Sequence, residues 1–317
     1  MESTTSIPEP KKRFNWQAPF KRLMDNPVIL KELRGRMRGR QAFILLTIYL
    51  GLISLFIILI YNLLNLSSSI TWDPSARQNA GKAIFGTVVL LELLLLSFIA
   101  PGLTAGAITS ERERQTFEIL RTTLLSARSL VLGKVGSAFS FLFLLILAAL
   151  PLESLAFLLG GVGLGEMIAS SLMLVVTAIF YCTLGIFFSS FMKRTLPATV
   201  SSYAVILLSF LLLAVIFFMI AYLESISSGQ FGAQTAEDFL SLILWLLIST
   251  NPLMAAIISE VILMDQQNLF YTTHSIFGGS SSIPFLISPW LIYTVVYLFM
   301  TVVMIWLSIR FVNRPDK

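Results

Sequence analysis

The chain alternates between long apolar runs and short polar segments. Six of the runs are long enough to cross a bilayer, which takes a helix of roughly 20 apolar residues. They cover residues 42–63, 83–107, 135–159, 167–191, 197–222 and 288–311. None of them alternates strictly between apolar and polar residues, as the strands of a membrane barrel do. The pattern therefore predicts an all-α polytopic membrane protein with six transmembrane helices.

A further apolar run, residues 239–264, is interrupted by Asn251 and Pro252. With six spans and both ends inside, 20 of the 22 lysines and arginines lie on the cytosolic side. This distribution agrees with the positive-inside rule. A seventh span would move the basic tail, residues 312–317, outside. We therefore expect a re-entrant helical pair within an outer region at 224–286, and a seventh span remains the alternative.

The polar residues 1–41 precede the first span and form an expected cytoplasmic tail. Asn26 and Pro27 are typical of a helix start, as N-cap and first helical residue. The following apolar residues fall on one face, and basic residues fall on the other. That pattern predicts a helix lying in the lipid headgroups.

The segment 108–134 joins the second and third runs and carries most of the charge between spans. Ser110 and Glu113 have the spacing of a capping box, S-x-x-E, at a helix start. Phe117, Leu120 and Leu124 recur on one helical face. We expect a short amphipathic helix at the membrane surface with its polar side facing water. The alternative is a solvated helix that only connects two spans.

The order of residues in this segment resembles the coupling-helix region of the type-2 exporter permeases of ABC (ATP-binding-cassette) transporters. The resemblance rests on the following residues: Glu111-Arg112-Glu113, Thr116, Glu118, Leu120 and Gly133-Lys134. NPVILKELRGRMRGR likewise resembles the elbow helix that precedes the first span in these permeases. The family usually has glycine, and often proline, where this chain has Gln115 and Leu125, so the helix exit is expected to differ in shape.

The resemblance implies a permease domain over residues 42–311 that docks into a separate ATP-binding subunit. It also implies a second permease copy or paralogue, location in the plasma or inner membrane, and no cofactor in this chain. ATP and Mg²⁺ would be bound by the partner. The residues implied to contact the ATPase subunit are Glu111, Arg112, Thr116, Phe117, Glu118 and Leu120.

Composition agrees with this interpretation and excludes several enzyme classes. The 317 residues are 56% hydrophobic and 12% charged, against about 25% charged in soluble domains. Gly133-Lys134 is followed by Val135, so the segment is not a phosphate-binding P-loop. A single histidine and a single cysteine give no metal-binding motif and no catalytic triad. We therefore expect no catalytic residue, no metal site and no ATPase site.

Two acidic residues lie inside predicted spans, where a buried carboxylate is costly and indicates function. Glu92 is a candidate for the substrate path or a proton site; the alternative is a hydrogen-bonded residue that ties helices together. Glu153 is expected to reach the interface and to be structural. The scarcity of charge in the spans favours an amphiphile, peptide or lipid-like substrate.

The expected function is therefore that of a permease subunit driven by ATP hydrolysis in another chain. Two alternatives remain. One is a membrane scaffold that recruits an ATPase without moving a substrate. The other is an ion-coupled secondary transporter, whose activity would depend on a gradient and on Glu92.

Overall fold

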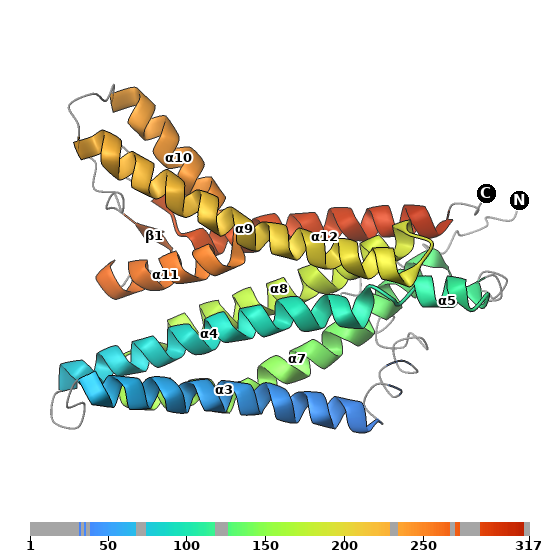
Figure 1. Ribbon diagram of the computed structural model, residues 1–317, viewed down its shortest axis with the longest axis horizontal. Coiled ribbons are helices and arrows are strands. Elements are labelled where there is room, and N and C mark those ends of the chain that lie inside the picture. The colour runs from blue at the N-terminus through green and yellow to red at the C-terminus, as the bar shows by residue number, and fades with distance from the viewer. Residues whose placement is uncertain are drawn as a thin grey trace, which may run out of the picture.

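The computed structural model describes residues 32, 35, 39–67, 74–117, 126–228, 234–266, 270–272 and 286–313. The elbow helix expected before residue 41 lies almost entirely outside the described residues. The described elements form a helical bundle with one two-residue β-ladder (Figure 1). In chain order they are α3 (Arg40–Ser67), α4 (Pro74–Thr104), α5 (Thr109–Glu113), α7 (Ala127–Leu159), α8 (Leu164–Phe191), α9 (Thr195–Ser228), α10 (Gln234–Thr250), α11 (Pro252–Gln266), β1 (Tyr271–Thr272), β2 (Leu286–Ile287) and α12 (Pro289–Asn313).

Six of the described helices are long and apolar enough to cross a membrane: α3, α4, α7, α8, α9 and α12. They coincide with the six predicted runs, and the prediction of an all-α membrane protein is confirmed. The helices extend beyond the apolar runs at several ends. α4 starts at Pro74 and α7 at Ala127, because a helix can continue through polar residues once it has left the bilayer.

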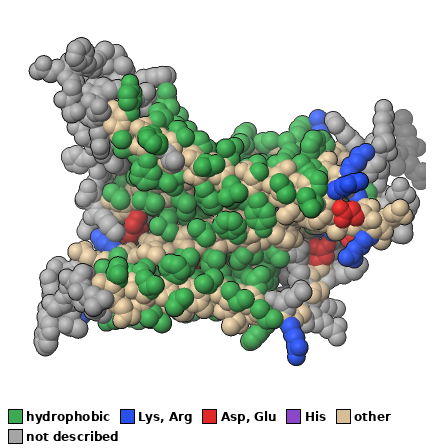
Figure 2. Space-filling model, in the orientation of Figure 1, with side chains coloured by type: hydrophobic (Ala, Val, Ile, Leu, Met, Phe, Trp, Pro, Cys, Tyr) green, Lys and Arg blue, Asp and Glu red, His purple; other side chains and the backbone are tan. Residues whose placement is uncertain are grey.

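α8 lies at the centre of the bundle and packs against α4, α7 and α12. It is the most buried of the six spans within this chain, whereas α3 and α9 leave most of their surface uncovered. The start of α3, the end of α12 and α5 all lie at one end of the bundle (Figure 1). Lysine and arginine gather at that end, and hydrophobic side chains cover the middle of the visible face (Figure 2).

The seventh apolar run forms two helices, α10 and α11, and the chain bends by 113° between them. Asn251 at the bend accepts hydrogen bonds from two N–H groups of the first turn of α11, at 3.1 and 3.2 Å. Its amide donates to the carbonyl of Ser209 in α9, and Tyr297 in α12 donates to the carbonyl of Thr250. Both helices extend from this bend toward the end opposite α5 (Figure 1).

The bend confirms the break predicted at Asn251 and Pro252. Asparagine satisfies the free N–H groups of a helix start, and proline fits the first helical position. The apex is bonded near the middle of two spans, at Ser209 and Tyr297. Such irregular backbone is tolerated at membrane depth where protein surrounds it. The placement of this pair relative to a membrane stays a prediction.

Candidate functional site

The candidate site is the segment between α4 and α7, at the charged end of the bundle. Its described helix, α5, has only five residues and ends at Glu113. Gln115 then adopts a positive φ of 58°, which turns the chain. A single regular helix running on toward Leu124 is therefore not formed. Glycine adopts this conformation without strain, whereas other residues pay about 1 kcal/mol or more; Gln115 occupies the position at which similar permeases usually have glycine.

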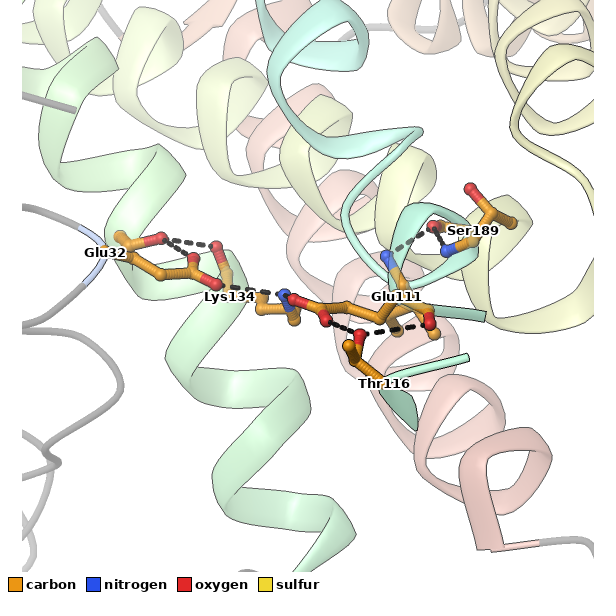
Figure 3. A network of polar contacts seen from close by, with 8 residues as sticks. Glu32, Glu111, Thr116, Lys134 and Ser189 are labelled. Atoms are coloured by element: carbon orange, nitrogen blue, oxygen red, sulfur yellow. Dashed lines mark hydrogen bonds and ion pairs between the residues drawn. The ribbon is translucent and has the colours of Figure 1, made fainter. Parts of the chain in front are cut away.

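The predicted capping box of Ser110 and Glu113 is wrong. No side chain caps the start of α5. Instead, the N–H groups of Ile108 and Thr109 donate to the hydroxyl of Ser189 in α8, at 2.8 and 3.1 Å (Figure 3). Residues near the start of α5 thus satisfy their donors through a neighbouring helix, which anchors this segment to α8.

The carboxylate of Glu113 caps the start of α9 rather than its own helix. It accepts hydrogen bonds from the backbone N–H and the hydroxyl of Thr195, at 2.7 and 2.8 Å. Thr195 is the first residue of α9, where free N–H groups and the helix dipole favour an anion. Glu113 therefore links α5 to α9, a role that sequence spacing alone does not reveal.

Arg112 and Phe117 turn inward, toward their own chain. The guanidinium of Arg112 donates to the carbonyl of Met192 at the end of α8, at 3.0 Å, and lies 5.0 Å from the centre of the Phe117 ring. Phe117 is only 4% exposed. Its ring packs into the bundle core, and a contact of Phe117 with the ATPase subunit stays a prediction.

The exposed residues of the described segment are Glu113, Arg114 and Gln115, with Glu111, Arg112 and Thr116 half-buried beside them. The contact expected from the sequence leaves out Glu113, Arg114 and Gln115, because it rests on one continuous helix. Glu118 and Leu120 lie outside the described residues. Among the described residues, the exposed part of this segment is therefore centred on Arg114.

One buried lysine connects three segments at this end of the bundle (Figure 3). The ammonium of Lys134, in α7, lies 2.9 Å from a carboxylate oxygen of Glu32 and 3.7 Å from one of Glu111. Ser137 donates to the second oxygen of Glu32 at 2.8 Å, and Thr116 donates to Glu111. We call these five residues the Lys134 network.

The Lys134 network joins α7 to α5 and to the segment that precedes α3. The side chain of Lys134 is 5% exposed, and a buried charge is stable only when it is paired. Lys134 belongs to the residues that carry the resemblance, but the sequence indicates no partner for it, and no sequence pattern singles out Glu32. The sequence signal for this site is a lysine at the edge of an apolar run. That signal indicates a buried charge, but it does not indicate which residues pair with it.

The two acidic residues inside the spans lie beside each other. Glu92 in α4 and Glu153 in α7 are both 0% exposed and close enough to interact electrostatically, and Tyr49 in α3 lies next to Glu92. Their side-chain oxygens have no hydrogen-bond partner of normal geometry in the described part of the chain. The expectation that Glu153 reaches the interface is wrong, since it faces the interior of the bundle.

Glu92→Gln is expected to leave the thermal unfolding temperature unchanged or to raise it. Burial without a counter-charge makes the ionised form of either carboxyl group costly, and glutamine avoids that cost because it cannot ionise. The measurement is intrinsic fluorescence during heating of the purified chain in detergent. Thr177→Val is the control, because it breaks a satisfied buried bond to Tyr293 (2.8 Å) and should lower the temperature. A clear drop for Glu92→Gln would contradict the argument.

The described part of the chain has six spans, a bend between the fifth and the sixth, and a short helix that is bonded to three of the spans. A comparison with curated proteins finds no match. The family model described as ABC-2 family transporter protein matches residues 27–314, which is nearly the whole chain. The chain therefore belongs to the ABC-2 family of transporter proteins, as a multi-pass membrane permease of an ABC transporter.

Proposed function

We propose that this permease moves an amphiphilic substrate across the membrane, driven by ATP hydrolysis in a separate ATPase subunit that binds ATP and Mg²⁺. The end of the bundle that carries α5 faces the cytosol, with both termini on that side. The concentration of lysine and arginine at this end supports that orientation (Figure 2). The Lys134 network is the observation that carries the proposal, because it connects the docking segment directly to a span.

The bonds around α5 provide a path by which movement of a partner reaches the membrane. Ser189 and the carbonyl of Met192 hold this segment to α8, Glu113 holds it to the start of α9, and Lys134 holds it to α7. A push on α5 therefore acts on three spans at once. We place the contact with the ATPase at the exposed residues 113–115, together with Glu111, Arg112 and Thr116, and extend it to Glu118 and Leu120.

A second permease copy or a paralogue would complete the transporter. α3 and α9 are the spans least covered by their own chain, with 11% and 12% of their apolar windows buried. Their outward faces consist of large hydrophobic side chains, such as Phe43 and Ile48 in α3 and Leu208 and Phe218 in α9. Both surfaces are suited to lipid or to another helix bundle.

The test is reconstitution of the chain with an ABC ATPase that copurifies with it. Vesicles containing the complex should move a labelled amphiphile only when ATP is present. Stable association with the ATPase but no flux would instead indicate a scaffold. Flux driven by an ion gradient without ATP would indicate a secondary transporter. Either result would overturn the proposal.

Glu111→Lys is expected to reduce ATP-driven flux at least about tenfold, because it replaces the acceptor of Thr116 and sets a second cation against Lys134. ATP hydrolysis by the associated subunit should continue. The same expectation applies to charge reversal at Glu118. The readout is the ratio of substrate moved to phosphate released.

Arg128→Glu is the matched control for this charge reversal. Arg128 is exposed in the first turn of α7, at the same end of the bundle as Glu111. Reversing the charge at Arg128 should leave the ratio of substrate moved to phosphate released close to that of the unmodified chain. Equal coupling in the Glu111→Lys and unmodified complexes would show that α5 does not transmit the motion.

A further inference from the structure

A cavity of about 300 Å³ lies between α4, α8, α11 and the start of α12. Its walls are mainly apolar and include Phe85, Val89, Met173 and Leu263. The volume falls at the lower end of the range of small-molecule sites. It lies toward the end of the bundle opposite α5, the end toward which α10 and α11 extend (Figure 1). Glu92 does not line it, so this cavity is separate from the buried acid pair.

Three charged side chains line this otherwise apolar cavity, each from a different helix: Lys82 from α4, Glu166 from α8 and Glu260 from α11. All three are half-buried. No ion pair within 4.0 Å joins them to one another in the described structure. One oxygen of Glu166 accepts a bond from the N–H of Gly163 at 3.2 Å. Figure 2 shows an acidic and a basic side chain side by side at this end, among hydrophobic ones.

With both carboxyl groups ionised, the three side chains carry one net negative charge. Lys82 can balance one of the two carboxylates, and the described residues that line the cavity include no second cation. A charge in apolar surroundings is costly without a counter-charge. A ligand with one positive charge would supply it, and an apolar tail would lie against the hydrophobic walls. Trp290 also lines the cavity, and indole is the side chain that binds cations best through its ring face.

We propose that this cavity binds an amphiphile whose head group carries a single positive charge. Glu260 and Glu166 bind the head group, Lys82 limits the number of cations to one, and Phe85 and Met173 contact the tail. This inference deepens the proposed function by naming the class of substrate, and it rests on that function for the step from binding to transport.

The test measures binding to the full chain in micelles of an uncharged detergent with a bulky head group. The probes are labelled dodecylamine, dodecanol and dodecanoate, which share one tail and differ in head-group charge. Dodecylamine is expected to bind at least about tenfold more tightly than the other two. Lysophosphatidylethanolamine, a zwitterion, should also bind more weakly. Equal binding of all probes, or tightest binding of the zwitterion, would overturn the proposal.

Two variants should change dodecylamine binding in opposite directions. Glu260→Gln removes the attracting charge with little change of shape and should weaken binding about tenfold, whereas Lys82→Met should strengthen it. A shift in the same direction for both would overturn the assignment of the charges. The unfolding temperature of each variant shows whether the fold is preserved.

A third variant tests the cavity by filling it. Gly86 lines the cavity, and an added Cβ there would lie 3.9 Å from Cγ of Glu260, an ordinary contact. Gly86→Ala should therefore be tolerated, and Gly86→Leu should block binding of dodecylamine without unfolding the chain. Undiminished binding in a folded Gly86→Leu variant would place the ligand elsewhere.

The binding assay requires neither the ATPase nor transport. If the chain did not bind dodecylamine specifically but the complex still moved another amphiphile with ATP, this inference would be overturned and the proposed function would stand. Specific binding without any ATP-driven flux in the reconstituted complex would overturn the proposed function and leave the site standing.

Discussion

Lys134→Met is expected to abolish most ATP-driven transport and to lower the stability of the chain by about 3 kcal/mol. That value is the lower end of the range for breaking a buried ion pair, because Glu32 is partly exposed, with 24% of its side chain accessible. The substitution keeps the apolar stem of the side chain, so the loss reports on the charge. Glu32 and Glu111 would be left without their shared cation, and α5 would lose its connection to α7.

The measurements for Lys134→Met are flux in vesicles and the thermal unfolding temperature of the purified chain. Arg128→Met is the matched control, since it removes a cation from an exposed position on the same helix. Exposed substitutions of this kind usually change stability by less than about 0.5 kcal/mol. If both variants behaved alike, Lys134 would not be the connecting residue that its contacts indicate.

A double-mutant cycle with Glu32→Gln separates the ion pair from general damage to the fold. Residues in direct contact give effects that do not add. Once Glu32 has been neutralised, removal of Lys134 should therefore cost less than it does alone. The exchange of the two charges, Glu32→Lys with Lys134→Glu, should restore part of the lost stability. Strictly additive effects would contradict the 2.9 Å contact between these residues.

Gly185→Ala is expected to be among the most damaging small substitutions in the bundle. An added Cβ on α8 would overlap the hydroxyl oxygen of Thr104 in α4 and would lie 3.1 Å from the backbone nitrogen of Ala105. Thr104 is fully buried, and its hydroxyl is bonded to the carbonyl of Ala100 at 2.8 Å. Close-packed interiors relax little, so overpacking here should cost about 1–3 kcal/mol or more.

The Gly185→Ala change should also impair transport, because Thr104 ends α4 directly before the docking segment. Gly51→Ala in α3 is the control: no atom lies within 4 Å of the added Cβ. In a helix interior that substitution should stabilise by about 0.5–1 kcal/mol. Thr104→Ala should partly rescue Gly185→Ala by removing the overlapped oxygen. Equal unfolding temperatures for the two glycine variants would contradict the close approach of α4 and α8.

Much of the fold could be predicted from the sequence because the signals for it are local. A span requires a long apolar run, and the bend at Asn251 and Pro252 needs only a capping residue followed by a proline. The end of α7 depends on a local feature too, because Gly160 adopts a left-handed φ of 76° directly after Leu159.

The candidate site was predicted only in outline, because its contacts join residues that are far apart in the chain. The segment lies between α4 and α7 as the sequence predicts, and the contact of Glu111, Arg112 and Thr116 with an ATPase subunit stays a prediction. The inward turn of Phe117 was missed because an apolar residue on a helix stripe can face lipid, a partner or its own core equally well. The role of Glu113 was assigned to the wrong helix, since its partner Thr195 lies 82 residues away.

The class of protein, the six spans, the break near residue 251 and the positively charged end of the bundle all follow from the amino-acid sequence alone. These properties depend on the length, polarity and local conformational preference of consecutive residues. Only the tertiary structure decided that Lys134 is paired with Glu32, 102 residues earlier in the chain, and that Glu92 meets Glu153. It also brought Lys82, Glu166 and Glu260 into one cavity. The physical reason is that the energy of a buried charge depends on which helices pack around it, and local periodicity does not specify that packing.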